Sequence, residues 1–408
     1  MYIGQLKNKK ILILGYGKEG KATEQYLKKS LPECEIGIAD KSQGDDYLQK
    51  QSEYDIVIKT PGIQKQLMTV PYTTATNIFF ANKGIHPVIG VTGSKGKSTT
   101  ASLIFHILQE AGIPAKLVGN IGNPALQELI EPPKEKTYFI YELSSYQLDD
   151  IEYSPHISII VSLFPEHMNY HGSEENYYEA KKKIIEHVTN KDFYVYNPHY
   201  SKLHDWSMYT IATPVLFETD FVPESTALQG NHNLSNIRGA ITVARMLNIS
   251  DEVSAKAIHS FKPLPHRLQK IGEYRGITFY DDAISTTPES TIAALEAIPQ
   301  VKTILLGGED RGYKYDILAE KLQSFAVEHV VLFPETAQKI KTSFEKIAFA
   351  PHILETENME KAVKFAYKHT PAGAVCMLST AAPSYSLWQN FEEKGDQFQL
   401  SVSRLGHD

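Results

Sequence analysis

Residues 93–99, Gly-Ser-Lys-Gly-Lys-Ser-Thr, have the types and spacing of a loop that binds phosphate groups. They follow the apolar residues 88–91 and precede an amphipathic stretch. The sequence therefore predicts a strand, a glycine-rich turn and a helix N-terminus. The glycines let backbone N–H groups approach a phosphate, while Lys97 supplies positive charge and Ser98 a hydroxyl ligand for magnesium.

The spacing of this loop is shorter than that of a full P-loop. The full pattern has a glycine five residues before Gly96, where this chain has Val91. The glycines are instead three residues apart, at Gly93 and Gly96. This spacing narrows the prediction from nucleotide hydrolases in general to a smaller group of ATP-using enzymes.

A second glycine-rich turn, Gly-Tyr-Gly-Lys-Glu-Gly, occupies residues 15–20 and follows the apolar residues 11–14. Asp40 ends the next apolar run, twenty residues beyond Gly20. This is the pattern of a dinucleotide fingerprint, which taken alone fits a nicotinamide or flavin dehydrogenase. The alternative is a tight turn whose glycines permit close packing of helix on strand. We favour phosphate or nucleotide binding.

Two side chains that can contact metal follow predicted strands near the phosphate loop. Glu142 comes directly after the apolar residues 138–141, and His167 follows the apolar residues 157–163. Because the carboxyl ends of parallel strands face the ligand-binding edge of a sheet, both are expected beside the phosphates. Taken alone, either residue is interpreted more simply as a loop residue with a capping role and no ligand. Together they favour metal or substrate contact.

The elements that must position these residues alternate between strands and helices along the whole chain, which predicts α/β folding with parallel sheets. Proline-marked turns near Pro87 and at residues 262–265 divide the chain. The expected segments are residues 1–86, 87–263 and 264–408. Helices are expected at residues 18–29, 98–111, 175–187, 236–247 and 290–298.

The bulk composition is that of a globular protein with 408 residues, 42% hydrophobic and 22% charged. A net charge of −7 argues against nucleic acid as the main partner. The two cysteines, Cys34 and Cys376, lie far apart in the sequence, so a disulfide framework is not expected. This usage is typical of a protein in the reducing cytoplasm. No apolar run approaches a membrane span, so we expect no membrane partner.

The order of further motifs resembles that of the Mur ligase family over essentially the whole chain. The matching pieces are GSKGKST at 93–99, GNIG at 119–122, ELSSYQL at 142–148, PEHM at 165–168, the lysine within YYEAKKK, GNHNLSN at 230–236, LPHR at 264–267, STTPEST after Asp281, LLGG at 305–308, and Ser384 with NFEEKGDQF. No single piece is specific, but the ordered set is.

The resemblance implies a Rossmann-like N-terminal domain, a central P-loop-type ATP-binding α/β domain and a Rossmann-like C-terminal domain. It also implies a cytoplasmic, monomeric enzyme that adds D-glutamate to UDP-N-acetylmuramoyl-L-alanine in peptidoglycan synthesis. The first domain would then hold the UDP moiety rather than a dinucleotide. The residues implied for the UDP substrate are Gly15, Tyr16, Gly17, Asp40, Thr60, Gly62, Asn120 and His167.

The same resemblance implies ATP and magnesium as cofactors, with a carboxylate first phosphorylated to an acyl phosphate and then attacked by an amine. Two magnesium ions are implied, one held by Ser98 and Glu142 and the other by His167 and a carbamylated Lys181. Without the resemblance, Lys181 reads as part of a solvated helix face. Lys97, Glu142, His167 and Lys181 are the implied catalytic residues. The implied ATP contacts are Gly93, Ser94, Lys95, Gly96, Lys97, Ser98, Thr99, Asn233, Asn236, Arg267 and Asp282.

The implied glutamate pocket departs from the family pattern. Where related ligases have Asp-Ser-Lys-Ala-Thr-Asn, this chain has residues 282–287, Asp-Ala-Ile-Ser-Thr-Thr, so Ile284 replaces a lysine. Arg311 lies near the position of a second family lysine. An arginine binds a carboxylate through two parallel hydrogen bonds, whereas a lysine acts as a point charge. The glutamate contacts carried over are Thr286, Arg311, Ser384 and Phe391.

Three alternatives to D-glutamate addition stay open. A variant group of these ligases that takes L-glutamate also resembles the STTP and DRG pattern. Another Mur or folylpolyglutamate-type ligase would use a different amino acid or acceptor. A nucleotide-dependent dehydrogenase would explain residues 15–20, but it leaves the phosphate loop and the LPHR motif unexplained.

Overall fold

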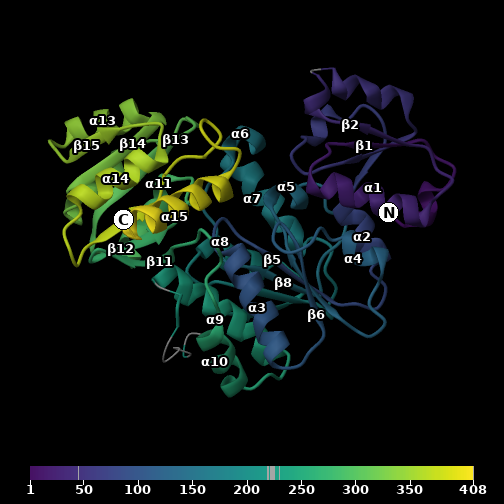
Figure 1. Ribbon diagram of the computed structural model, residues 1–408. Coiled ribbons are helices and arrows are strands. Elements are labelled where there is room, and N and C mark those ends of the chain that lie inside the picture. The colour runs from purple at the N-terminus through teal and green to yellow at the C-terminus, as the bar shows by residue number, and fades with distance from the viewer. Residues whose placement is uncertain (45, 218–219, 221–225, 229, 408) are drawn as a thin grey trace. The chain divides into compact units, whose positions relative to one another are not determined.

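The computed structural model describes residues 1–44, 46–217, 220, 226–228 and 230–407. By its internal packing the chain divides into two compact units. Residues 1–226 with 235–261 form the first unit, and residues 227–234 with 262–408 form the second. Within the described residues the strands form three sheets (Figure 1), two in the first unit and one in the second. This confirms the predicted α/β class.

The N-terminal sheet has strand order β2-β1-β3-β4, and its strands are parallel. Residues 11–14 are buried throughout, as expected for a parallel strand covered on both faces. The elements are β1 (Ile11–Leu14), α1 (Lys18–Ser30), β2 (Ile36–Ala39), β3 (Ile56–Lys59), β4 (Tyr72–Thr74) and α2 (Ala75–Asn82), with 3₁₀ turns η1 (Ile3–Leu6), η2 (Lys41–Gln43), η3 (Tyr47–Glu53) and η4 (Lys65–Leu67).

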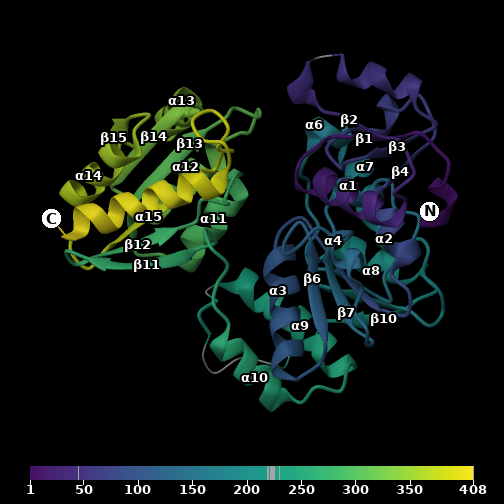
Figure 2. The same ribbon diagram turned by 45° about the vertical axis from the view of Figure 1, so that its right-hand side comes forward.

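The central sheet is also parallel, in the order β10-β9-β8-β5-β7-β6. Its middle strand β5 leads into the phosphate loop, and α3 packs against α10 beside it (Figure 2). The elements are β5 (Val88–Thr92), α3 (Lys97–Glu110), β6 (Ala115–Gly119), α4 (Gln127–Ile130), β7 (Tyr138–Glu142), α5 (Ser145–Leu148), β8 (Ile157–Ile160), α6 (Met168–His171), α7 (Glu174–Lys182), η5 (Lys183–Ile185), β9 (Phe193–Tyr196), α8 (Ser201–Ser207), β10 (Thr213–Leu216), α9 (Asn231–Met246) and α10 (Asp251–Ser260).

The sheet of the second unit runs β11-β12-β16-β13-β14-β15, with β11 antiparallel to β12 and the other neighbours parallel. Helices α14 and α15 lie side by side against it (Figure 2). The elements are β11 (Gln269–Tyr274), β12 (Ile277–Asp281), α11 (Pro288–Ala297), β13 (Val301–Gly308), α12 (Asp316–Ser324), β14 (His329–Glu335), α13 (Ala337–Lys346), β15 (His352–Glu355), α14 (Met359–His369), β16 (Val375–Leu378) and α15 (Phe391–His407).

Alternate residues of the inner strands supply the two cores of this second sheet. Leu305 and Val331 pack in one core with residues of α14 and α15. Their neighbours Ile304 and Val330 pack in the other core with residues of α11, α12 and α13. Because successive side chains of a strand point to opposite faces, one apolar run fills both cores.

Most predicted elements are confirmed, with differences at their ends. The strand expected at 157–163 ends at Ile160, because Ser162 instead bonds to the phosphate loop. The helix expected at 175–187 ends at Lys182 and continues as η5. Residues 269–274, which the sequence did not suggest as a strand, form the antiparallel β11. The boundaries at 86/87 and 263/264 stay predictions. Within the described part of the chain, no helix combines the length and apolarity needed to cross a membrane.

Candidate functional site

The phosphate loop joins β5 to α3, as predicted, and its shape depends on two glycines. Gly93 and Gly96 have φ of +155° and +84°, so both adopt backbone conformations that favour glycine. A Cβ on Gly96 would lie 2.2 Å from Oδ1 of Asn236, which also accepts a hydrogen bond from Thr100. Asn236, one of the predicted ATP contacts, therefore packs against the loop.

Hydrogen bonds of Ser94 connect the phosphate loop to the segment after β8. Its hydroxyl donates to the carbonyl of Phe164 and accepts from the N–H of the same residue and from the Tyr177 hydroxyl. Ser162 adds bonds to the backbone of Lys95. These bonds hold the loop to the segment after β8 and to α7. The sequence did not single out Ser162, Phe164 or Tyr177.

Two lysines approach the carbonyl of Gly93 from different elements. Nζ of Lys97, the first residue of α3, donates to the carbonyls of Gly93 and Ser94 at 3.0 and 2.9 Å. Nζ of Lys181, on α7, donates to the Gly93 carbonyl at 2.7 Å. Ser98 and Thr99 follow on the first turn of α3 and are buried. The predicted phosphate-binding lysine and the predicted modified lysine therefore share one backbone acceptor.

Lys181 is not a solvated helix residue: it is 1% exposed. Burial lowers the pKa of its amine well below the usual range, and the ammonium group of Lys97 lowers it further. The ring of Tyr177 lies 4.9 Å from Nζ. Burial and the charge of Lys97 both disfavour the charged ammonium form of Lys181.

Glu142 ends β7 beside the loop. It pairs in register with Val91 of β5 and with Gly119 of β6, and Asn120 follows at the same edge of the sheet. Glu142 is 3% exposed, and its Oε2 has no hydrogen-bond partner among the described residues. A buried carboxylate oxygen without a donor is costly unless a cation binds it, so the residue fits a metal ligand.

His167 lies at the same edge, in the left-handed backbone region with φ of 57°. Burial lowers the pKa of its imidazole to about 4, although Glu166 opposes this effect. A neutral imidazole is the form that binds metal. Burial alone would raise the pKa of Glu166, but Lys95 and Lys97 outweigh it and hold that pKa below its usual range. Glu166, which pairs with Lys95 at 2.8 Å, was not among the predicted site residues.

The turn of the N-terminal sheet brings together several residues predicted for the UDP moiety. Gly15 has φ of +91°, and a Cβ there would meet Oγ1 of Thr60 at 2.0 Å. Asp40 accepts from the N–H of Tyr16 at 2.7 Å, and this bond and those from Ser42 lower the pKa of its carboxyl group. The remaining predicted residues here, Gly17 and Gly62, have open space at the Cβ position.

Glu19 lies on the first turn of α1 and was missed by the sequence reasoning. Burial raises the pKa of its carboxyl group to about 7. Its Oε2 accepts a 3.3 Å bond from Gln147 at the N-terminal end of α5. No local pattern indicates this burial, because a glutamate near the start of a helix is typical of a surface residue that complements the helix dipole.

The carboxylate of Asp282, a predicted ATP contact in the second unit, accepts hydrogen bonds from within the protein. Oδ1 accepts from the N–H of Leu268 and Oδ2 from the Ser379 hydroxyl, at 3.1 and 2.8 Å. Burial raises the pKa of this carboxyl group to about 6. Leu268 directly follows Arg267, so these bonds fix the backbone beside that predicted ATP contact. Asn233 lies on α9 within the same unit.

Two of the residues predicted for glutamate, Arg311 and Ser384, lie on loops that meet at the carboxyl edge of the second unit's sheet. The loop after β13 packs on the loop after β16, since the Glu309 N–H donates to the Pro383 carbonyl. Arg311 pairs with Glu309 at 2.9 Å and lies 5.7 Å from the ring of Tyr385. The hydroxyl of Ser384 is buried and has no hydrogen-bond partner in the described part of the chain.

The segments carrying Thr286 and Phe391 approach the same region. Thr380 donates to the carbonyl of Ser285, the neighbour of Thr286. The ring of Phe391 lies 6.1 Å from that of His266. Lys394, which the sequence reasoning missed, is fully buried and donates to the Thr380 hydroxyl at 2.6 Å. Burial lowers the pKa of this amine to about 7.

Comparisons with known proteins bear on the whole chain. The family model of the Mur ligase middle domain matches residues 91–209, and that of the Mur ligase, glutamate ligase domain matches residues 266–381. The chain is 31% identical over 457 aligned residues to UDP-N-acetylmuramoylalanine--D-glutamate ligase of Streptococcus pyogenes serotype M49 (strain NZ131). The alignment covers 100% of this chain and 99% of that relative.

Solved structures share the fold at lower identity. UDP-N-acetylmuramate-alanine ligase MurC from Thermotoga maritima is 18% identical with a TM-score of 0.65, over 98% of this chain and 99% of its own. MurF ligase from Thermotoga maritima in complex with ADP is 16% identical with a TM-score of 0.64, over 99% and 97%.

Proposed function

Because this chain belongs to the Mur ligase family, we propose that it joins D-glutamate to the alanine carboxylate of UDP-N-acetylmuramoyl-L-alanine through an acyl phosphate. The chain is an ATP-dependent ligase of peptidoglycan synthesis. The identity of the amino acid, the intermediate and the residue roles are the proposed part.

One observation supports the chemistry most strongly. At the carboxyl edge of the central sheet, Lys97 and Lys181 meet at the Gly93 carbonyl, and the buried Oε2 of Glu142 has no partner among the described residues. Two lysine amines and a buried carboxyl group thus converge beside a phosphate loop. ATP phosphates and a carboxylate acceptor are both anionic, so a site that joins them needs such counter-charge.

The proposed reaction has two steps. The alanine carboxylate attacks the γ-phosphorus of ATP, and ADP leaves. The glutamate amine then attacks the acyl carbon, loses a proton and expels inorganic phosphate. In this scheme Lys97 stabilises charge on the phosphoryl oxygens, the loop N–H groups orient the triphosphate, and Asn120 and His167 approach the acyl acceptor.

The donor set fits magnesium. Ser98 and Glu142 would hold one ion, and His167 with the carbamate of Lys181 a second. Magnesium supplies charge neutralisation between phosphate and carboxylate when bound. Carbamate formation joins Nζ of Lys181 to carbon dioxide and releases one proton. The lowered pKa of this buried amine supports that step, because burial favours the neutral form, which carries the reacting electron pair.

Glutamate is the proposed amino acid because Arg311, Thr286 and Ser384 lie on loops of the second unit and Phe391 begins α15, as the family resemblance places the glutamate contacts. Arg311 offers a bidentate donor to a carboxylate. L-glutamate is the second candidate, because residues 285–288 (STTP) and 310–312 (DRG) also resemble the variant group that takes L-glutamate.

The test is phosphate release from ATP with magnesium and UDP-N-acetylmuramoyl-L-alanine, run separately with D-glutamate and L-glutamate. Release with D-glutamate, at least tenfold faster than with L-glutamate, supports the proposal. The reverse preference reassigns the amino acid to L-glutamate. Release with neither amino acid, but with another from a panel, would overturn the glutamate assignment.

A monomeric state and a cytoplasmic location remain predictions of the sequence. The proposed partners are the small molecules ATP, glutamate and the UDP-linked acceptor. Nicotinamide-cofactor binding without ATP dependence would instead favour the dehydrogenase alternative.

A further inference from the structure

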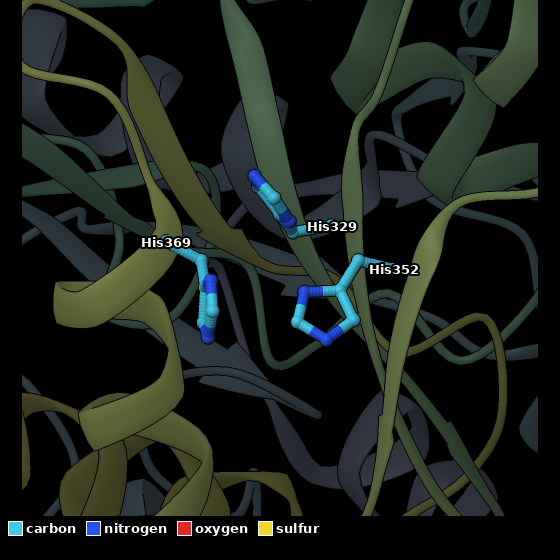
Figure 3. Close-up of side chains that lie close together, drawn as sticks. All are labelled: His329, His352 and His369. Carbon is cyan, nitrogen blue, oxygen red and sulfur yellow. The ribbon is translucent and has the colours of Figure 1, made fainter.

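Three histidines from separate elements converge in the second unit, away from the residues discussed so far. His329 is the first residue of β14, His352 the first of β15 and His369 the last of α14. The parallel register pairs His329 directly with His352. One ring nitrogen from each residue lies within 4.8 Å of the other two, and Figure 3 shows the rings facing a common space.

This histidine cluster lies at the opposite edge of the sheet from the proposed glutamate pocket. Strands β14 and β15 are parallel and begin at the cluster. The other end of β14 reaches Glu335, which pairs with Gly308 next to the loop that carries Arg311. Because the pocket is at the carboxyl ends of the strands and the histidines are at the amino ends, the ligase chemistry does not use the histidines.

The surroundings of the cluster favour a bound cation. The buried Nδ1 of His329 has no hydrogen-bond partner among the residues described. Helix α14 ends at the cluster, and the C-terminal end of a helix attracts positive charge. A carboxylate oxygen of Glu328 lies 4.0 Å from Nε2 of His329.

We propose that His329, His352 and His369 bind one divalent transition-metal ion, of which Zn²⁺ is the representative. Imidazole nitrogen suits zinc, copper and nickel, whereas magnesium and calcium prefer oxygen. In a tetrahedral zinc site the nitrogens lie roughly 3.3 Å apart, because each bond is about 2.0–2.1 Å. The rings therefore close on the ion by small side-chain rotations. A water molecule takes the fourth position.

Access and packing are compatible with this site. His352 is exposed, which leaves a path for the ion, whereas the side chain of His329 is 16% exposed. The rings of His352 and His369 are nearly perpendicular at 4.6 Å between centroids, and Phe365 flanks both. A bound ion would link β14, β15 and α14 and stabilise the folded second unit.

The experiment uses the full chain, freed of metal with a chelator. Zn²⁺ binding is measured by elemental analysis after dialysis, and Co²⁺ binding by visible absorption, which is much stronger for a four-coordinate nitrogen site than for a six-coordinate oxygen site. The variants are His352→Gln and His369→Gln. The control is His187→Gln, which removes an exposed histidine of the other unit.

We expect one equivalent of Zn²⁺ and an intense Co²⁺ spectrum for the unmodified chain and for the control. Removing a residue that only hydrogen-bonds to a metal ligand lowers metal affinity roughly 10–100-fold. Each cluster variant removes a ligand itself, so its Zn²⁺ affinity should fall by more than that. Ligase activity in magnesium should not change, and metal-free unfolding midpoints show whether each variant folds. No Zn²⁺ uptake by the unmodified chain, or equal uptake and spectra in folded cluster variants, would overturn the proposal.

Discussion

Nζ of Lys181 lies 2.7 Å from the carbonyl oxygen of Gly93, so the buried lysine of α7 contacts the first glycine of the phosphate loop. The two residues are 88 positions apart in the chain. This contact places the buried amine of Lys181, whose pKa burial lowers, beside the phosphate loop.

The first prediction concerns this amine. Lys181→Gln removes the carbamate-forming nitrogen and should lower kcat for phosphate release about 10²–10³-fold, the cost of losing one preorganised electrostatic group. Its neighbour Lys182 is far more exposed, so Lys182→Gln should retain activity. A carbamate carbon signal after incubation with ¹³C-bicarbonate should appear in the control and be lost in Lys181→Gln. Equal activity in both variants would contradict the assigned role.

A second prediction follows from the unpartnered oxygen of Glu142. Glu142→Gln should lower phosphate release about 100-fold at limiting magnesium. It should leave the metal-free unfolding midpoint nearly unchanged or raise it, because the substitution removes a buried charge. Glu135→Gln, at an exposed carboxylate, is the control. A large loss of metal-free stability together with normal magnesium dependence would show that Glu142 is structural.

The glutamate side provides a third prediction. Arg311→Ala should raise KM for glutamate about 10–100-fold, because the variant loses a charge-assisted hydrogen bond to the substrate carboxylate. The KM for ATP should not change. Lys339→Ala removes a cation that pairs with Asp310 on the same loop, so it tests for general disturbance of the loop. A rise in the ATP KM instead would place Arg311 at a different ligand.

The fourth prediction is a pH dependence. The folded pKa of Lys394 is about 7 and its ordinary value is 10.5, so between these values the unfolded chain binds one proton more than the folded chain. The free energy of unfolding therefore rises with pH across this window. The slope approaches about 1.4 kcal/mol per pH unit from this residue. Below pH 7 both states are protonated and the contribution is constant.

The measurement is urea unfolding at several pH values, followed by the fluorescence of Trp388, whose ring lies 6.0 Å from Nζ of Lys394. Trp206→Phe serves as the background, since the chain has two tryptophans. Lys394→Met should remove the pH slope, whereas Lys361→Met, at an exposed lysine, should keep it. Identical slopes in the two variants would contradict the lowered pKa.

Parts of the site could be predicted from local sequence because local rules determine them. Gly93 and Gly96 mark a turn with positive φ, and Glu142 directly follows an apolar run, so its position at the sheet edge follows from the strand. The structure agrees in each case. The same rule placed Asp40 beside the first glycine turn, where it accepts from the N–H of Tyr16.

Other parts depend on tertiary contacts that local sequence does not encode. Lys181 and Lys394 each sit among charged residues in the sequence, and nothing local distinguishes them from surface lysines. The family resemblance alone suggested Lys181. The pairing of His329 with His352 arises from the parallel register of β14 and β15, which joins residues from separate strand-helix units. Strand β11 was missed because its residues are mixed in polarity.

The most direct test of the proposed function is a competition in one reaction. The reaction contains the enzyme, ATP, magnesium and UDP-N-acetylmuramoyl-L-alanine, with equal amounts of ¹⁵N-labelled D-glutamate and unlabelled L-glutamate. The mass of the product is then measured by mass spectrometry. The account predicts a UDP-linked product enlarged by one glutamate residue and carrying the ¹⁵N label. An unlabelled product, or consumption of ATP with no glutamate-containing product, would contradict it.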